Sequence, residues 1–372
     1  MSKTLPDKIA SSIYTDYIES GLIKCGGRLP TIRELQRQYG RSNSIIVHAL
    51  GLLDSRGVIE KKSDGICYVA SEAKLTEKRM PKMIGSVVPA MTEPNFVMRI
   101  HTGVEEACRE FGYQVISASA NLSYEIEEQQ VMRLIDVGCE AVIVTPVIRT
   151  RKQIKHDYLK SIPSTYPMVL VDVAYPEQKH TQVILDNFNA GYDMTKLLLN
   201  EGHRKIAFME SNSSDGNLMH RSNWERCDGY LRALRSAGIV PCPEDRWLIK
   251  AWYTQDEDLM NNELIALLRR WKEMPDRPTA IIALEDFYAM QIITLGRELG
   301  ISVPDDLKVV GFDNLDLANR LGATFPTTNP DMALAGKIAV SLAVQQLEGR
   351  IADPTTYVLP VPIRVRTSAL DD

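Results

Sequence analysis

The stretch from Gly26 to Val69, GGRLPTIRELQRQYGRSNSIIVHALGLLDSRGVIEKKSDGICYV, predicts two short helices followed by a β-hairpin. Thr31 and Glu34 have the T-x-x-E spacing of a capping box, in which each side chain accepts a backbone N–H at a helix start. The first of these helices should therefore begin at Thr31. It should end at Gly40, because glycine commonly terminates helices.

The second helix should begin after Ser42, which can cap it, and end at Gly57. Strands are then expected at 58–61 and 66–69, joined by the turn Ser63-Asp64-Gly65. The inward face of this helix carries apolar residues at helical spacing, namely Ile46, Ala49, Leu50 and Leu53.

An earlier helix completes the N-terminal unit, 1–70, and should end at Gly21. Its apolar face consists of Ile9, Ile13, Tyr17 and Ile18. Three helices and a hairpin make a winged helix-turn-helix, whose third helix enters the DNA major groove by its N-terminal end. Ser42, Asn43 and Ser44 lie at that end and can bond bases or phosphates, and Lys61 and Lys62 place charge on the wing.

The stretch resembles the GntR family of regulators in its order of Arg-Leu-Pro, Arg-x-Leu, Ala-Leu-x-x-Leu and Gly-Val-Ile. The resemblance implies that Arg33, the positions from Ser42 to Ser44, and the wing around Gly65 face operator DNA. A winged helix that binds only protein is the alternative.

The chain departs from the GntR pattern at two positions. Asn43 stands where the family usually has Arg, and Val47 stands where a second Arg is usual. Arg41, one position early, can replace one of these contacts.

Charge is distributed unevenly along the 372 residues, whose formal net charge is −5. Residues 1–70 hold ten Lys/Arg and seven Asp/Glu, a net +3, and the remaining residues hold 33 and 41, a net −8. A basic N-terminal unit on an acidic remainder fits a protein in which only the first unit meets phosphate.

Other features of the composition predict a cytoplasmic protein without a cofactor. The six cysteines form no C-x-x-C pair, the six histidines have no metal-ligand spacing, and we expect no metal. The N-terminus lacks an apolar signal core, and no run approaches the ~20 apolar residues of a membrane span. Residues 71–82, SEAKLTEKRMPK, are charged and aperiodic, and we interpret them as a linker.

Residues 83–372 alternate short apolar strands with amphipathic helices, which predicts an α/β body with parallel sheets covered on both faces. Candidate strands are 84–88, 114–118, 141–145, 168–171, 205–209, 247–250, 280–284 and 308–312. Helices are expected at 96–111, 125–137, 188–200, 226–237, 257–272 and 287–299. The number of units favours two doubly wound lobes facing each other across a cleft, with ligands at the carboxyl ends of the strands.

The body resembles the LacI/GalR family and its periplasmic sugar-binding relatives. The resemblance is carried in order by segments that include MIGSVVP, GVEEACREFGYQVI, LDNFNAGYDMTKLLLNEGHRKIAFME and LGISVPDDLKVVGFDN. It predicts a first lobe of about 83–184 plus 315–345 and a second of about 185–312 plus 350–368. A GntR-type unit on such a body also resembles the arabinose repressor architecture, which implies a sugar-responsive repressor.

Asp172 follows the strand MVLV, Asp286 follows TAIIALE, and Arg226 opens a helix in R-x-x-G-Y. By the resemblance these three positions meet the ligand, and one Arg between two Asp can clamp a polyol. Glu285 stands where the family often has Asn, which makes the site more acidic. Helix capping by the aspartates and a structural ion pair at Arg226 are the alternatives.

The remaining effector candidates come from loops at strand ends. Trp252 and Tyr253 can stack on a sugar ring, Asn95 and Phe96 can close the other lobe, and Ser119 or Asn121 can add a contact. Ordinary packing is the alternative for both aromatic residues. Asp186-Asn187 and Asp313-Asn314 are interpreted as capping and crossover elements.

These features predict a sequence-specific transcriptional regulator, a homodimer released from operator DNA by a small effector, most simply a sugar. A purine effector is the main alternative, and the opposite sign of regulation stays open. A cleft enzyme is disfavoured because the chain has no nucleophile with a credible base, no Walker loop and no G-x-G-x-x-G after a strand.

Overall fold

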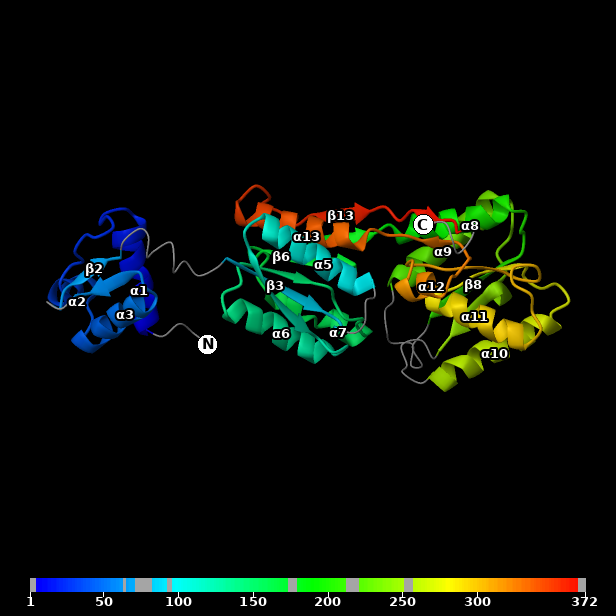
Figure 1. The fold of residues 1–372 in the computed structure, drawn as a ribbon, viewed down its shortest axis with the longest axis horizontal. Helices are drawn as coiled ribbons and strands as arrows, with labels where there is room; N and C mark the ends of the chain where they lie inside the picture. The colour runs from blue at the N-terminus through cyan, green and yellow to red at the C-terminus, as the bar shows by residue number, and fades with distance from the viewer. Residues whose placement is uncertain are drawn as a thin grey trace. The chain divides into compact units, whose positions relative to one another are not determined.

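A computed structural model describes residues 5–62, 65–70, 82–91, 96–172, 179–211, 221–250 and 257–366. The side chains of Phe96 and Glu257 lie outside this description. The chain divides into two compact units, Met1–Pro81 and Lys82–Asp372, which we call the head and the body (Figure 1).

The head is the predicted winged helix. Its elements are α1 (Leu5–Ile13), the π-helical turn η1 (Tyr14–Glu19), α2 (Ile32–Tyr39), α3 (Asn43–Ser55), β1 (Ile59–Lys61) and β2 (Cys67–Val69). The two strands are antiparallel, with Ile59 opposite Val69. One apolar core joins α1, α2, α3 and the hairpin, and all four predicted inward residues of α3 are buried in it.

The helix boundaries of the head follow from local chemistry. Thr31 and Glu34 form the predicted capping box, and Gly40 ends α2 in the left-handed conformation with φ of 60°. Ser42 occupies the N-cap position of α3 without a side-chain capping bond, because its hydroxyl lies 3.1 Å from that of Ser44. In the predicted wing turn, Ser63 and Asp64 lie outside the described residues.

The first lobe of the body is built on a parallel six-stranded sheet in the order β13-β7-β6-β5-β3-β4. Its strands are β3 (Met83–Val88), β4 (Gln114–Ser119), β5 (Ala141–Val144), β6 (Met168–Asp172), β7 (Thr181–Leu185) and β13 (Thr356–Leu359). Helices α5 (Phe96–Glu110) and α13 (Met332–Leu347) cover one face (Figure 1). The other face is covered by α6 (Tyr124–Asp136) and the short η2 (Tyr158–Ser161), and α7 (Arg151–Lys155) lies between these two in sequence.

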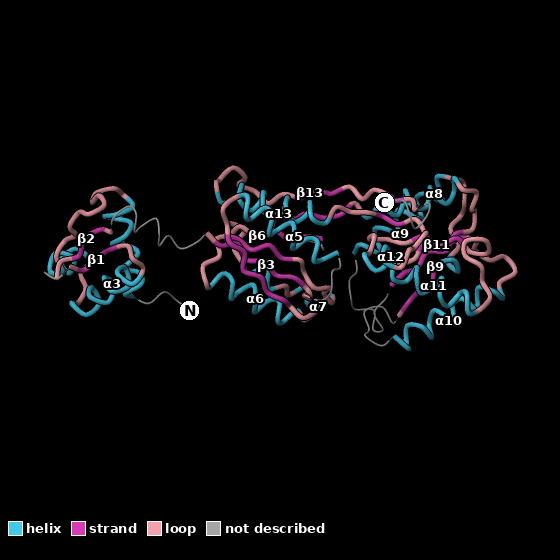
Figure 2. Tube along the Cα trace, viewed as in Figure 1, coloured by secondary structure: helices cyan, strands magenta, loops and turns pink. Residues whose placement is uncertain are grey.

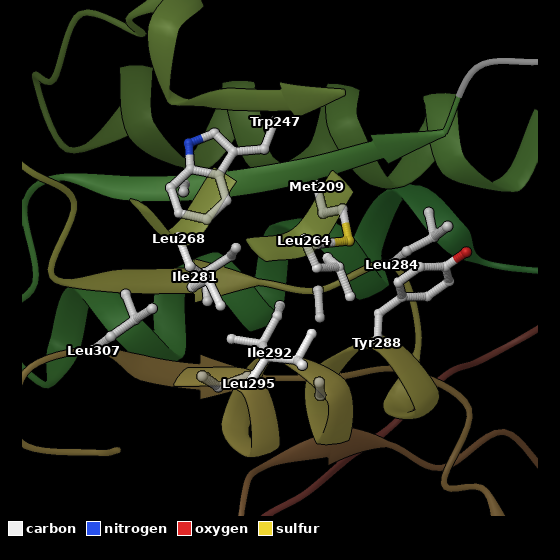
Figure 3. Close-up of a cluster of buried hydrophobic side chains, with 14 of the residues drawn as sticks. Met209, Trp247, Leu264, Leu268, Ile281, Leu284, Tyr288, Ile292, Leu295 and Leu307 are labelled. Carbon is white, nitrogen blue, oxygen red and sulfur yellow. The ribbon is translucent and has the colours of Figure 1, made fainter. Parts of the chain in front are cut away.

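The second lobe is built on a parallel four-stranded sheet in the order β11-β10-β8-β9. Its strands are β8 (Ile206–Ser211), β9 (Arg246–Ile249), β10 (Ala280–Ile282) and β11 (Lys308–Val310), and a 3-10 turn, η3 (Pro243–Asp245), precedes β9. One face packs against α8 (Asn187–Asn200) and α9 (Arg221–Ser236). The other packs against α10 (Glu257–Glu273) and α11 (Asp286–Glu298), where Trp247, Ile281 and Ile292 interdigitate (Figure 3).

Three chain segments pass between the lobes, and they are bonded side by side (Figure 2). The first, after β7, is joined to the third by a bond from the Asp186 N–H to the Leu359 carbonyl at 2.9 Å. The second contains β12 (Thr327–Thr328) and the third contains β14 (Ile363–Arg364), and these two strands pair antiparallel. We call the three segments the strap.

The lobe boundaries differ from the predicted ones in two places. Strand β13 lies in the first sheet, whereas the sequence placed all of 350–368 in the second lobe. Helix α12 (Asp316–Arg320) belongs to the second lobe, where Ala318 and Phe325 are buried beside α11, whereas the sequence placed 315–345 in the first. Only α13 of that range packs on the first sheet.

The eight strands predicted in the body are all present, but the sequence did not predict β7, β13 or the two-residue strands β12 and β14. Strand β7 alternates between buried and half-buried residues and so lacks the continuous apolar run of its neighbours. Strand β13 is an edge strand with three of its four residues exposed, and such a strand carries little hydrophobic pattern.

Candidate effector site and DNA-binding surface

The predicted DNA-reading residues lie on the surface of the head. Arg41, Ser42, Asn43 and Ser44 are all exposed at the start of α3. Backbone N–H groups at a helix start are free to bond phosphate oxygens, and the helix dipole favours negative charge there. Arg33 is also exposed, on α2.

The wing carries its basic residues at the tip of the hairpin. Lys61 ends β1 and is exposed, and the ammonium group of Lys62 lies over the Tyr68 ring, 4.4 Å from its centroid. Gly65 has φ of 78°, a conformation that favours glycine in the turn.

In the body, Arg226 is the centre of a buried polar cluster. Its Nε donates to Asn187 Oδ1 at 2.9 Å, its Nη1 to the Leu284 carbonyl at 3.2 Å, and its Nη2 pairs with Asp313 Oδ1 at 2.9 Å. The guanidinium also lies over the Phe312 ring, 4.3 Å from the centroid. A buried arginine held on both sides in this way presents a fixed donor edge.

Two glycines fix the backbone on which Arg226 stands. A Cβ on Gly191 of α8 would lie 2.0 Å from the Arg226 carbonyl oxygen, and a Cβ on Gly229 of α9 would lie 2.0 Å from the Phe188 carbonyl oxygen. No other residue allows such an approach, so α8 and α9 pack with their backbones in contact. The sequence thereby sets the position of Arg226 relative to Asn187.

The Asp313 loop follows β11 and has an unusual backbone. Asp313 and Asn314 both have positive φ, 83° and 45°. Their N–H groups donate to the hydroxyls of Thr328 and Thr327 in the strap, at 3.0 and 3.3 Å. These bonds offset the strain of two consecutive left-handed residues and direct the Asp313 carboxylate to Arg226.

Two further carboxylates are electrostatically coupled to the Arg226–Asp313 pair. Asp172 ends β6 in the first lobe with φ of 74°, and Glu285 is the N-cap of α11 in the second. Burial, reinforced by the charge of Asp313, raises the pKa of both groups to about 7, and Arg226 opposes the rise. We call these four side chains, the Arg226–Asp313 ion pair and the two carboxyl groups coupled to it, the acidic cluster.

Asp286 does not pair with Arg226, although the sequence placed it beside that residue. Its Oδ1 accepts from the Thr327 hydroxyl at 2.5 Å, and its Oδ2 accepts from the Leu315 N–H at 3.0 Å and faces Arg366 at 3.4 Å. Burial raises its pKa to about 6, and the bond from Thr327 opposes the rise. The side chain is fully buried and joins the start of α11 to the segments that contain Leu315 and Thr327. Asp313, and not Asp286, is the carboxylate that pairs with Arg226.

The other predicted effector residues are placed only in part. Ser119 ends β4, where its hydroxyl donates to Asn121 Oδ1 at 2.9 Å and accepts from the Asn121 N–H at 3.1 Å. Phe96 is the first residue of α5. Asn95, Trp252 and Tyr253 lie outside the described residues.

Sequence reasoning missed Asp313 and Asn187 as members of the site. Both were interpreted as crossover or capping residues, and they have those roles too: Asn187 begins α8 and Asp313 leads into the strap. The available signal was the position of Asp313 directly after the buried strand segment VVGF, a carboxyl end where ligands bind in such sheets.

The described residues contain no group of three or more His, Cys, Asp or Glu side chains that could hold a metal ion. None of their helices is both long and apolar enough to cross a membrane.

A winged helix followed by two doubly wound lobes defines a class of DNA-binding proteins with a ligand-binding body. Residues 7–69 match the family described as bacterial regulatory proteins, gntR family. Residues 195–369 match the family described as periplasmic binding protein-like domain. The chain is a DNA-binding transcriptional regulator with a gntR-type head and a periplasmic-binding-protein-like body.

Similar proteins are named as repressors. The HTH-type transcriptional repressor PurR of Photobacterium profundum is 27% identical, covering 92% of this chain and 99% of its own. The arabinose metabolism transcriptional repressor of Geobacillus stearothermophilus is 28% identical over 94% of both chains. These names agree with a regulator and disfavour the cleft enzyme.

Solved structures share the fold. The transcriptional regulator CelR in complex with cellobiose has a TM-score of 0.60 at 21% identity, covering 91% of this chain and all of its own. A LacI family transcriptional regulator from Silicibacter pomeroyi also has a TM-score of 0.60, at 23% identity, covering 78% and 99%.

Proposed function

We propose that the chain represses transcription by binding operator DNA through α3 and the wing, and that a small effector held by the acidic cluster releases it. The observation that carries the effector site is the pair of Arg226 and Asp313 at the carboxyl end of one sheet, coupled to Asp172 at the carboxyl end of the other. Strand ends of doubly wound sheets are where ligands bind.

The chemistry of the acidic cluster favours a neutral polyhydroxyl ligand, most simply a sugar. Sugar hydroxyls donate to carboxylate oxygens and accept from a guanidinium, and the cluster offers both. An anionic ligand would meet three carboxylates against one cation. The names of the arabinose repressor and of the CelR–cellobiose complex support a sugar.

A purine is the second candidate effector. Its ring N–H groups can donate to Asp172 or Glu285, and the relative named PurR covers nearly the whole chain. Purines bind most tightly when they are stacked between aromatic rings. Phe312 does not offer such a face, because it is fully buried in the core of the second lobe and the Arg226 guanidinium lies over its ring.

In the proposed mechanism a cytoplasmic homodimer places two heads on a pseudo-palindromic operator. Effector binding draws the lobes together around the acidic cluster, and this change alters the spacing of the heads. Effector and operator then favour different states of the protein, so each weakens binding of the other.

The testing experiment is a thermal titration of the full chain with pentoses, hexoses, hexuronates and purine bases. A ligand that binds only the folded state raises the melting temperature by mass action. We expect a concentration-dependent rise with one neutral sugar. A rise with purines alone would replace the sugar by the second candidate, and no rise with any compound would refute the effector site in its proposed form.

A further inference from the structure

Arg99 links the two lobes beside the acidic cluster. It lies in the first turn of α5, in the first lobe. Its Nη2 donates to the Asn314 carbonyl oxygen at 2.9 Å and pairs with the carboxylate of Asp316. Asn314 and Asp316 belong to the segment that leads from β11 into α12 of the second lobe.

The contact falls on the Asp313 loop, which the second lobe and the strap hold through its N–H groups and through the side chains of Asp313 and Asn314. The N–H groups of residues 313 and 314 donate to Thr328 and Thr327, and that of Leu315 donates to Asp286. Arg99 binds the same loop through a carbonyl, from the opposite lobe. The loop that aims Asp313 at Arg226 is thus held from both lobes.

The helix that carries Arg99 is firmly attached to the first lobe. A Cβ on Gly103 would lie 1.9 Å from the Ala333 carbonyl oxygen, and one on Gly336 would lie 2.1 Å from the Ile100 carbonyl oxygen. Helices α5 and α13 therefore pack with their backbones in contact, one helical turn from Arg99. A movement of the first lobe must move Arg99 with it.

We propose that Arg99 is a positioning residue that orders the Asp313 loop only while the lobes are together. Its guanidinium donates from the first lobe to the Asn314 carbonyl oxygen, and lobe separation withdraws this donor. This inference rests on the proposed function for its meaning, because Asp313 is the carboxylate that aims the effector-binding Arg226. The regulator would therefore couple lobe position to the order of its own effector site.

The test is hydrogen–deuterium exchange of the full chain without effector or DNA, comparing wild type with Arg99→Gln. The N–H groups of residues 313–315 are all hydrogen-bonded, so their exchange reports the order of the loop. We expect Arg99→Gln to accelerate their exchange about two- to fivefold, the size set by a partly exposed ion pair. The N–H groups of β10 should exchange as in the wild type. Arg99→Lys, which keeps a cationic donor, should stay within about twofold of wild type.

Arg109→Gln is the matched control, since Arg109 is an exposed arginine in the last turn of the same helix. Unchanged exchange at 313–315 in Arg99→Gln, or an equal rise in Arg109→Gln or in β10, would overturn the proposal. Equal rises in Arg99→Lys and Arg99→Gln would do so too. The measurement uses no ligand, so a negative result would refute the role of Arg99 only. The proposed function is tested separately by the sugar titration.

Discussion

At the scale of single residues, Arg226 determines what the candidate site can bind. It is buried, and its three hydrogen-bond partners come from α8, the segment after β10 and the Asp313 loop. An arginine restrained on so many sides holds its orientation before a ligand arrives, which lowers the entropy cost of binding.

The first prediction concerns Arg226→Lys, which retains the positive charge and loses the fork of donors. A lysine cannot bond Asn187, Leu284 and Asp313 in the same plane. We expect the effector-induced rise in melting temperature to be lost while operator binding remains. Arg235→Lys, at an exposed position of the same helix, is the control. Loss of operator binding in Arg226→Lys would instead identify Arg226 as a purely structural residue.

The second prediction concerns pH and Asp172. Its folded-state pKa of about 7 lies above the value of about 3.9 in an unfolded chain, so the folded protein binds the proton more tightly. The stability contributed by protonated Asp172 is fully present below about pH 4 and is lost as the pH rises through about 7. The ionised carboxylate therefore destabilises the protein at neutral and higher pH.

Asp172→Asn should accordingly raise the free energy of unfolding at pH 8, by ~1–3 kcal/mol. The gain should shrink steadily as the pH is lowered from 7 to 4. Denaturant unfolding at several pH values measures it. Asp228→Asn, on the exposed face of α9, should show no such trend. A gain that is the same at every pH would show that Asp172 does not titrate in this range.

The candidate site was predictable at this scale only where a residue type and its strand position agree. Asp172 and Arg226 satisfied both conditions and lie in the acidic cluster. Asp286 and Asp313 each follow a buried strand, and sequence alone cannot tell which carboxylate turns toward Arg226. The choice depends on Thr327, which comes from a distant segment and bonds Asp286.

At the scale of elements, the packing of α8 against α9 determines the geometry of the candidate site. Gly191 and Gly229 allow the two helix backbones to touch, and this contact fixes the backbone position of Arg226. The corresponding pair in the first lobe, α5 and α13, uses Gly103 and Gly336 in the same manner. Each lobe thus has one face on which two helices move as a single body.

The third prediction is that Gly191→Ala separates α8 from α9. The new methyl would overlap the Arg226 carbonyl oxygen, and overpacking of this kind costs about 1–3 kcal/mol. We expect lower stability in urea and a weaker response to the effector. Gly296→Ala in α11 is the control, because its Cβ would have no neighbour closer than 3.7 Å. Its stability should be unchanged or up to about 1 kcal/mol higher. Equal losses in both variants would argue against the backbone contact.

The fourth prediction concerns the head. Lys61→Ala should weaken binding of all DNA sequences and reduce the slope of log affinity against log salt by about 1, because a phosphate contact is lost. Asn43→Ala should leave the slope unchanged and reduce discrimination between operator and random duplex. Fluorescence anisotropy at several salt concentrations measures both. Lys8→Ala on α1 is the control, and a slope change as large as that of Lys61→Ala would contradict the assignment of the wing.

Elements were predictable where periodicity was strong. The capping box at Thr31, the apolar face of α3 and the buried strand β5 were found because local propensity and burial agree. Strand β13 was missed because it joins the first sheet from the far end of the chain. Its partner, β7, is far away in sequence, and a local pattern carries no information about such pairing.

At the scale of the whole molecule, the proposed function requires that effector and operator binding be linked. Linkage makes the two effects reciprocal in size. The fifth prediction is that a saturating effector lowers operator affinity by the same factor by which a saturating operator duplex lowers effector affinity, about 5–150-fold. Calorimetric titration of the effector with and without the duplex measures it. A factor of one would contradict the proposed release.

The strap has a mechanical consequence for the body. Its three segments are hydrogen-bonded to one another and connect the two lobes. The strap resists stretching and shearing, because these motions break the Asp186–Leu359 bond and the pairing of β12 with β14. It yields to folding about its width, which changes backbone torsions and leaves those bonds intact. The lobes therefore move most easily by bending about the strap, and a ligand needs to supply free energy for that bending motion alone.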